Sequence, residues 1–268
     1  MALKGGADEK ELQPLVRHCV LCGACGAVCP MGVDTIGITI SIKSGLDMDA
    51  LDREGLSRLE SKRGAYFMPG SAMRADEGVL RSTAALLRGY ELTGDDAEPL
   101  VASLEGRQEI SQTEAARYMG GLRQRVGKLV LAEGILHRLF MSFLGTGNVI
   151  GIGEALLGIK SVRCALRSSD MYIIDSRAFH ADFKRMLGFY DGLRREHGLM
   201  MNLDLQRSAS SPGVTSGACG VNPEAQARWI MNGRDAKRVV VERVEDMAIF
   251  KAVTDVPVVH LCQAGDEQ

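Results

Sequence analysis

Short runs of β-branched and aliphatic residues alternate with a helical pattern in the second half of the chain. MYIIDS, RVVVERV and VPVVHLC are strand candidates, because β-branched residues favour extended backbone. Apolar residues recur at three- and four-residue steps from Phe179 to Leu193, as on one face of a helix. Parallel strands need crossover connections, usually helices that cover the sheet. The alternation therefore predicts an α/β fold with mostly parallel sheets.

The first 60 residues have a different character and predict a small helical N-terminal domain over residues 1–60. An exposed helix is expected over 46–59, followed by a short linker, SKRG. The α/β pattern then fills residues 61–268. It opens with a strand in AYFMPG and a helix over 72–91, and continues with a strand in KLVLAEG and a helix that ends at Gly145.

Composition excludes several classes of function. The formal net charge of −2 gives no field that favours nucleic acid or anionic membrane, and 5 % aromatic residues are few for stacking on bases. The N-terminus lacks the apolar core of a signal peptide, and no stretch has the length of a membrane span. We therefore expect a cytoplasmic protein, in which clustered cysteines indicate a metal or catalysis rather than disulfides.

Glycines and histidines offer weaker signals. GTGNVIGIG, from Gly145 to Gly153, follows a predicted helix, whereas a dinucleotide-binding loop follows a strand. We interpret it as a flexible connector. The five histidines show no paired metal spacing; His18 lies beside Cys19 and is placed either to tune a cluster or in solvent at a helix end. No nucleophile–base motif or phosphate loop is present.

Four of the seven cysteines lie within eleven positions, in CVLCGACGAVCP. Their spacing is C-x2-C-x2-C-x3-C-P, the run that binds [4Fe–4S] clusters in bacterial ferredoxins. Gly23 and Gly26 let the backbone turn closely around a cofactor. A zinc ribbon needs two separated C-x2-C pairs. The run predicts a [4Fe–4S] cofactor, with zinc as the alternative, bound by Cys19, Cys22, Cys25 and Cys29.

The fourth ligand stays open at this point. In two-cluster proteins the last cysteine of such a run binds the other cluster, and this chain has only one run. Cys29 either completes the cubane itself or leaves that place to a distant cysteine. A further possibility is that Cys29 joins the distant cysteines around a second cluster. Those candidates are Cys164, Cys219 and Cys262, each of which is otherwise a small buried apolar residue.

The cysteine run resembles the ferredoxin-like part of heterodisulfide reductase subunits and of the iron–sulfur subunits of glycolate oxidase and anaerobic glycerol-3-phosphate dehydrogenase. In that group a cysteine-rich CCG domain of two similar α/β halves follows. The strand, helix, strand, SGACGVNPEAQARW and closing VPVVHLCQ are similar in layout to its second half, and MPGSAMRADEGVLRSTAALL to the opening of its first. The resemblance implies a two-half α/β domain behind the iron–sulfur segment.

The departures from that family bear on its second, disulfide-cleaving cluster. Members carry a Cys-Cys-Gly triplet in each half, whereas this chain has one Ala218-Cys219-Gly220 and no equivalent in the first half. Ser71 stands where they place a cysteine, and a closing C-x-x-C pair is absent. Hydroxyl and methyl groups do not replace thiolates in a soft site. We therefore interpret the domain as a degenerate scaffold, in which Cys219 is a weak metal candidate, alone or with Cys262.

Three functions compete. The resemblance favours an electron-transfer subunit of a multi-subunit oxidoreductase, with a flavoprotein or hydrogenase-type partner and no catalysis in this chain. The alternative is a non-catalytic iron–sulfur protein whose cluster is structural or senses redox state and whose α/β domain binds a partner. A third is a thiol- or disulfide-reducing enzyme that uses Cys219, against which the missing triplets count.

Overall fold

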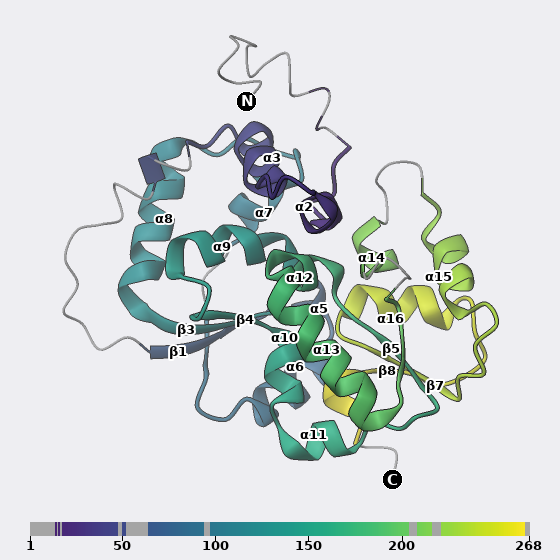
Figure 1. The fold of residues 1–268 in the computed structure, drawn as a ribbon. Coiled ribbons are helices and arrows are strands. Elements are labelled where there is room, and N and C mark those ends of the chain that lie inside the picture. Colours follow the sequence, from purple (N-terminus) through teal and green to yellow (C-terminus); the bar gives the residue numbers. More distant parts are fainter. Residues whose placement is uncertain are drawn as a thin grey trace.

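The computed structural model describes residue positions 14, 16, 18–47, 50–51, 64–93, 97–203, 208–215 and 221–265. Two four-stranded, all-parallel sheets form its framework (Figure 1). The first has the order β2-β1-β3-β4 and the second the order β6-β5-β7-β8. The prediction of an α/β fold with two halves and parallel sheets is confirmed. Most of the helix expected over 46–59, the linker and Cys219 lie outside the described residues.

The first half follows the N-terminal helices α2 and α3 and alternates strands with crossover helices. Its elements are β1 (Gly64–Met68), α5 (Ser71–Ala75), α6 (Glu77–Leu86), β2 (Glu91–Leu92), α7 (Glu98–Leu104), α8 (Gln112–Arg125), β3 (Val126–Leu131), η2 (Gly134–Leu136), α9 (His137–Leu144), β4 (Val149–Gly151), α10 (Ile152–Leu157) and α11 (Lys160–Cys164). The interpretation of residues 145–153 as a flexible connector was wrong. Its central residues pair with β3 as the edge strand β4, because Val149 and Ile150 extend the sheet.

The second half repeats the layout. Its elements are β5 (Asp170–Ile173), α12 (Ser176–Ala181), α13 (Phe183–His197), β6 (Met200–Met201), α14 (Pro212–Thr215), α15 (Pro223–Met231), β7 (Arg238–Val241), α16 (Val244–Lys251), β8 (Val258–His260) and η3 (Leu261–Gln263). The predicted strands are confirmed. Two expected helices are each divided, at Asp76 and at Asp182, and the Asp76 side chain caps the second part by accepting from the Val79 N–H at 3.0 Å.

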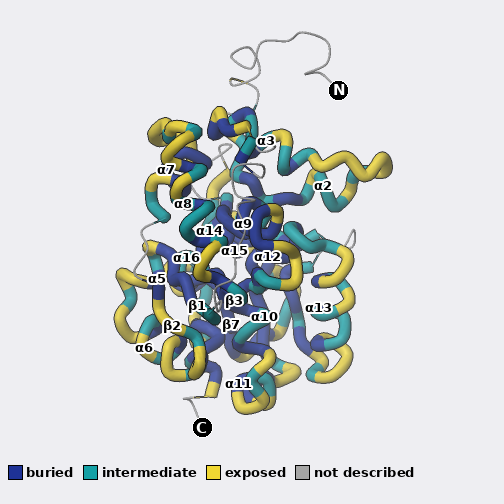
Figure 2. Tube along the Cα trace, turned by 90° about the vertical axis from the view of Figure 1, so that its left-hand side faces the viewer, coloured by how far each residue is buried: buried dark blue, intermediate teal, exposed yellow. Residues whose placement is uncertain are grey.

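The first sheet is buried on both faces, and alternate residues belong to different cores. Phe67 and Val130 pack in the core that extends through the second half. Met68 and Leu129 face α7, α8 and α9 and share a second core with Leu21 of the cysteine segment. Figure 2 shows the strands as the most buried part of the chain, with exposed residues on the outer helices. The cysteine segment is thus packed onto the first half through apolar side chains.

α3 (Thr35–Ser44) anchors that segment. Asp34 caps its N-terminus by accepting from the Gly37 N–H at 3.0 Å, and Gly45 ends it in a left-handed conformation. Ile36 and Ile40 are buried in the core shared with the first half. The other N-terminal helix, α2 (Ala24–Val28), is a single turn inside the cysteine run. In Figure 1 both lie at the same end of the molecule as α9 and α12.

Candidate functional site

The loop that holds the first cysteines is shaped by two unusual backbone conformations. Leu21 has a φ of 53° and Gly23 a φ of 85°, so the chain reverses direction just before α2. A Cβ atom at Gly23 would lie 2.4 Å from Cβ of His180, far inside contact distance. Glycine is therefore required there for its left-handed backbone and for the close approach of α12.

α12 and α3 fix the carbonyl groups of this loop. Arg177 donates from Nε to the Val20 carbonyl at 3.0 Å, and His180 Nδ1 lies 2.7 Å from the Cys22 carbonyl. From α3, Lys43 Nζ donates to the Cys19 carbonyl at 2.9 Å. These contacts join the cysteine loop to residues up to 158 positions away. The thiols are thereby held on a framework rather than on a free turn.

The Cys19 thiol responds to the charges of two neighbouring cysteines of the run. Burial raises the pKa of the half-buried Cys19 thiol, and the charges of Cys22 and Cys25 raise it further, while Lys43 acts in the opposite direction. Cys25 is exposed, and its Sγ lies 3.1 Å from Oγ1 of Thr35. All six cysteines in the described residues are free thiols. The Cys22 and Cys25 thiols thus lie near enough to Cys19 for their charges to act on it.

Cys29 is the cysteine of the run that borders a cleft. It follows the end of α2 and lines a cleft of about 510 Å³ between the cysteine segment, α9 and α12, which none of the other three cysteines lines. The cleft also contains Arg138 and Lys184. Backbone N–H groups of Val33, Met31 and Gly32 lower the pKa of the Cys29 thiol. This cluster of amides favours an anionic sulfur at this point.

The chemistry of these donors fits an iron–sulfur cubane. Soft thiolates with nearby backbone amides are the ligands and outer contacts that such clusters use. Among the described residues no group of three or more His, Cys, Asp or Glu side chains is arranged around one metal ion. A cubane presents four separate irons, each to one thiolate, so its ligands stand further apart than the ligands of a single ion.

The distant cysteines do not join this group. Cys164 is exposed at the end of α11, which lies at the opposite end of the molecule from α2 in Figures 1 and 2. Cys262 is buried in the core that extends through the second half, with its Sγ 3.1 Å from Nδ1 of His260 and 3.7 Å from the Val79 carbonyl. Neither completes the coordination of Cys19, Cys22 and Cys25. Cys219 lies outside the described residues.

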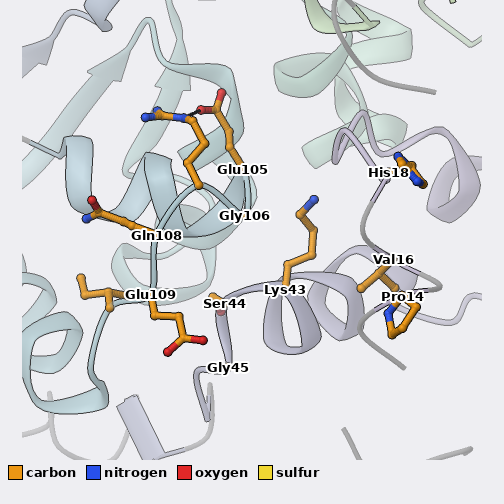
Figure 3. Close-up of a pocket in the computed structure, with 12 residues that line it drawn as sticks. Pro14, Val16, His18, Lys43, Ser44, Gly45, Glu105, Gly106, Gln108 and Glu109 are labelled. Carbon is orange, nitrogen blue, oxygen red and sulfur yellow. Dashed lines mark hydrogen bonds and ion pairs between the residues drawn. The ribbon is translucent and has the colours of Figure 1, made fainter. Parts of the chain in front are cut away.

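A second cleft, of about 1040 Å³, opens on the other side of the cysteine loop. Figure 3 shows Lys43 and His18 on one side of it and the turn from Glu105 to Glu109 on the other. His18 is exposed here, as one of its two sequence interpretations requires. Since Lys43 also holds the Cys19 carbonyl, this cleft brings solvent close to the cysteine loop.

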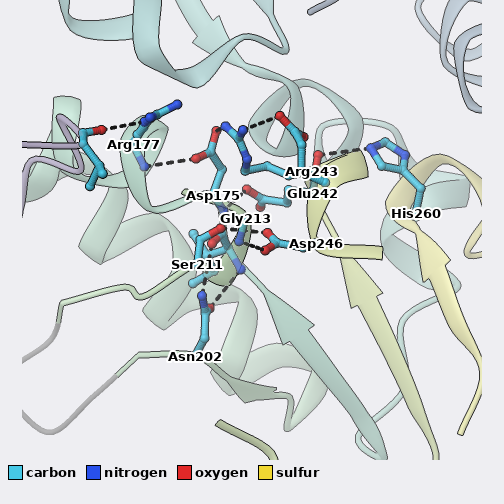
Figure 4. A network of polar contacts seen from close by, with 12 residues as sticks. Asp175, Arg177, Asn202, Ser211, Gly213, Glu242, Arg243, Asp246 and His260 are labelled. Atoms are coloured by element: carbon cyan, nitrogen blue, oxygen red, sulfur yellow. Dashed lines mark hydrogen bonds and ion pairs between the residues drawn. The ribbon is translucent and has the colours of Figure 1, made fainter. Parts of the chain in front are cut away.

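The carboxyl ends of the strands carry a buried polar network that the sequence analysis missed (Figure 4). Glu242 follows β7 and accepts hydrogen bonds from Tyr172 and Tyr190 at 2.7 and 2.5 Å, and from the Asp175 N–H at 2.8 Å. Burial raises the pKa of Glu242 to about 7, although these hydrogen bonds act in the opposite direction. Charged residues directly after a β-branched run were the available signal, because the carboxyl ends of parallel strands share one edge.

Arg243 and Asp246 complete this network. Arg243 Nη1 lies 3.6 Å from Oδ2 of Asp175. Asp246 accepts from the Ser211 hydroxyl at 2.7 Å and the Gly213 N–H at 2.6 Å, and burial raises its pKa to about 6 against the charge of Arg243. Charge pairing reduces the cost of burying these groups, although Nε and Nη1 of Arg243 have no hydrogen-bond partner among the described residues.

The network fills most of the space at the carboxyl ends of these strands. The space between Gly70, Glu133, Glu242 and Arg243 is about 10 Å³, room for one water molecule at most. A Cβ atom at Gly153 would lie 2.1 Å from Cδ of Glu242. The described residues at these strand ends therefore leave no room in this space for a group as large as an iron–sulfur cluster.

Comparisons with protein-family models, with curated proteins and with solved structures found no match. Within the described part of the chain, no helix combines the length and the apolarity that crossing a membrane requires. The candidate site accordingly stands on its own residues and geometry.

Proposed function

We propose that this chain is an electron-transfer iron–sulfur protein. Cys19, Cys22 and Cys25 would hold a [4Fe–4S] cluster, with Cys29 as the fourth thiolate. The supporting observation is that the first three thiols lie on one loop whose carbonyl groups are fixed by Arg177, His180 and Lys43. When bound, the cluster supplies reversible one-electron chemistry, and the protein supplies position, burial and hydrogen bonds.

Lys43 has a specific part in this proposal. Its ammonium group donates a hydrogen bond to the Cys19 carbonyl, and its charge lowers the pKa of the Cys19 thiol. Adding an electron makes a thiolate-bound cluster more negative, so a nearby cation favours the reduced state. Lys43→Gln is therefore expected to lower the midpoint potential, as followed by a redox titration of the visible spectrum. An unchanged midpoint potential would show that Lys43 does not influence the cluster.

We propose that the electron donor and acceptor belong to other subunits, since no group of three or more His, Cys, Asp or Glu side chains that could hold a metal ion is present among the described residues. A flavoprotein or hydrogenase-type subunit of an oxidoreductase complex similar to heterodisulfide reductase fits this arrangement. A structural cluster is the second candidate, favoured by Leu21, which lies in the loop and is buried in the core shared with the first half. Redox cycling separates these two roles.

The test is the cofactor content of anaerobically purified protein. We expect about four irons and four sulfides per chain and an EPR signal that appears on one-electron reduction. Cys22→Ala should abolish the signal, whereas the matched variant Cys164→Ala should retain it because Cys164 is exposed on α11. A cluster that never cycles but whose removal unfolds the chain would favour the structural role. Colourless protein that contains zinc would reject both.

A further inference from the structure

Arg177 is a partly buried charged side chain without an acidic partner. Its Nε donates to the Val20 carbonyl at 3.0 Å, and in the described part of the chain its two Nη groups make no hydrogen bond or ion pair. By contrast, Arg238 and Arg243, which are buried in the second half, each have a carboxylate within ion-pair distance. Guanidinium groups removed from water are seldom left unpaired, because burying a charge is costly. The open Nη groups of Arg177 therefore indicate a side chain that binds an anion.

The acid beside Arg177 is already committed to other groups. Figure 4 shows Asp175 between Arg177 and Arg243. One Asp175 oxygen accepts from the Arg177 backbone N–H at 3.0 Å, and the other lies 3.6 Å from Nη1 of Arg243. Burial lowers the pKa of the Arg177 guanidinium and the charge of Arg243 lowers it further, while Asp175 and Glu133 raise it. The Arg177 side chain thus has positive charge to offer a ligand.

Arg177 lines the cleft of about 510 Å³ between the cysteine segment, α9 and α12. Sites for small molecules usually enclose about 300–1,000 Å³ and combine an apolar wall with a few polar groups. The cleft has such a wall, formed by Leu21, Ile36, Ile40, Ile135 and Phe183. An apolar wall beside an open guanidinium fits an organic molecule better than an inorganic ion.

The other charges of this cleft leave it positive. Two acids line it, and each is paired with an arginine: Asp34 with Arg138 at 2.6 Å, and Asp182 with Arg185 at 2.5 Å. Lys184 also lines the cleft and is exposed, and it has no ion pair among the described residues. The acids are therefore neutralised, whereas the lysine and the open guanidinium are not.

We propose that this cleft binds a small organic anion, whose carboxylate or phosphate group accepts hydrogen bonds from the two Nη groups of Arg177. Its apolar body would lie along Ile135 and Phe183, and Lys184 would attract it at the exposed side of the cleft. The planar fork of a guanidinium matches both kinds of oxyanion. This inference goes beyond the proposed function and does not depend on it, because the side chains that carry it are not the proposed cluster ligands.

Three probes with one apolar body test the site: hexanoate, hexyl phosphate and hexan-1-ol. Titration of each into the full chain, followed by NMR of the probe, gives its Kd. We expect at least one of the two anions to bind at least tenfold more tightly than hexan-1-ol, because the alcohol has no charge for Arg177. The tighter anion identifies the head group. Equal binding of all three probes, or no binding of either anion, would overturn the proposal.

Variants locate the bound anion. Arg177→Gln should weaken binding of the tighter anion at least tenfold. Arg81→Gln is the matched control, because Arg81 also donates from Nε to a carbonyl but lies exposed on α6. Since Arg177 supports the cysteine loop as well, Lys184→Glu is a second variant at an exposed position and should weaken binding at least threefold. Unchanged affinity in Arg177→Gln would place the anion elsewhere, and if that variant does not fold, Lys184→Glu decides.

A negatively charged iron–sulfur cluster is the competing partner of Arg177. Cys22→Ala, which is expected to lack the cluster, separates the two. The tighter anion should bind the loaded wild type and Cys22→Ala with similar affinity. Binding to Cys22→Ala alone would assign the charge of Arg177 to the cluster and overturn the anion site, leaving the electron-transfer proposal standing. Wild-type protein that contains no iron but binds the anion would reject the proposed function and retain this inference.

Discussion

The two halves of the α/β region share one topology and differ in the chemistry of their strand ends. Both sheets have an inner pair of strands with one short strand outside each, all parallel. Met68 pairs with Leu131 in the first sheet as Ile173 pairs with Val241 in the second. The equivalence continues beyond the strands, because the next N–H after β3 and after β7 donates to the last residue of β1 and of β5.

This register identifies matched positions. The residues after the strand ends of the first half are Gly70, Ala132 and Glu133, and their counterparts in the second half are Asp175, Glu242 and Arg243. One half thus contributes mostly small residues and the other mostly charged ones. Gly153 has no side chain where Glu242 packs against it. Gly134 likewise leaves space for Asp175 and Arg243. The two halves therefore share a scaffold but differ in side-chain size, and the small residues of the first half accommodate the polar side chains of the second.

The largest expected effect concerns a buried ion pair that exists in one half only. Arg238 donates two hydrogen bonds to the Asp170 carboxylate, from Nε to Oδ1 at 3.0 Å and from Nη2 to Oδ2 at 2.7 Å. The two side chains are only 5 and 1 % exposed. Arg238→Met should lower the free energy of unfolding by about 3–5 kcal/mol, because it leaves Asp170 buried and unpaired. Lys128 occupies the matched position of the first half and is exposed, so Lys128→Met is the control. Urea denaturation measures both, and equal effects would break the comparison.

Glu242 makes the second half sensitive to pH. Its pKa is about 7 in the folded chain against 4.5 for an ordinary glutamate, so the folded state holds the proton more tightly. Stability from this group is present below pH 4.5 and falls by up to about 3 kcal/mol as pH rises to 7 and above. Glu242→Gln keeps a polar group between the two tyrosines and should remove that decline. The free energy of unfolding between pH 5 and 8 checks this; an unchanged slope would contradict it.

The smallest effect tests the space that the first half provides. Gly153→Ala places a methyl group against the Glu242 carboxyl and should cost about 1–3 kcal/mol through overpacking. Gly120→Ala in α8 meets no atom within 4 Å and should stabilise the chain by up to about 1 kcal/mol. Thermal unfolding of the two variants at one pH distinguishes them. A Gly153→Ala variant as stable as the wild type would show that Glu242 moves freely.

Much of the framework could be predicted because strand patterns are local. The β-branched runs at β5, β7 and β8 and the cysteine spacing each lie within a few residues. The errors arose where local signals compete. Asp76 lies inside an apolar period yet starts a new helix by capping it. Glycines around Val149 concealed an edge strand whose pairing comes from β3.

The arrangement of the site depended on contacts that no local pattern encodes. The contact of His180 with the Cys22 carbonyl joins residues 158 positions apart, and nothing around either residue indicates the other. The network around Glu242 draws on β5, α13 and β7. The cleft beside Cys29 likewise depends on where α2 ends and on α9 and α12, which bound it.

The close packing of Gly23 against His180 makes the cysteine loop depend on a helix that is synthesised much later. The cysteines are made before α12, so their loop gains the contacts of Arg177 and His180 only when α12 has been made and β5 has joined its sheet. A nascent or truncated chain that stops before this helix has the four thiols without the surface that positions them. If the proposed cluster is bound, its insertion would be coupled to completion of the fold, and a half-made chain would be a poor recipient of iron.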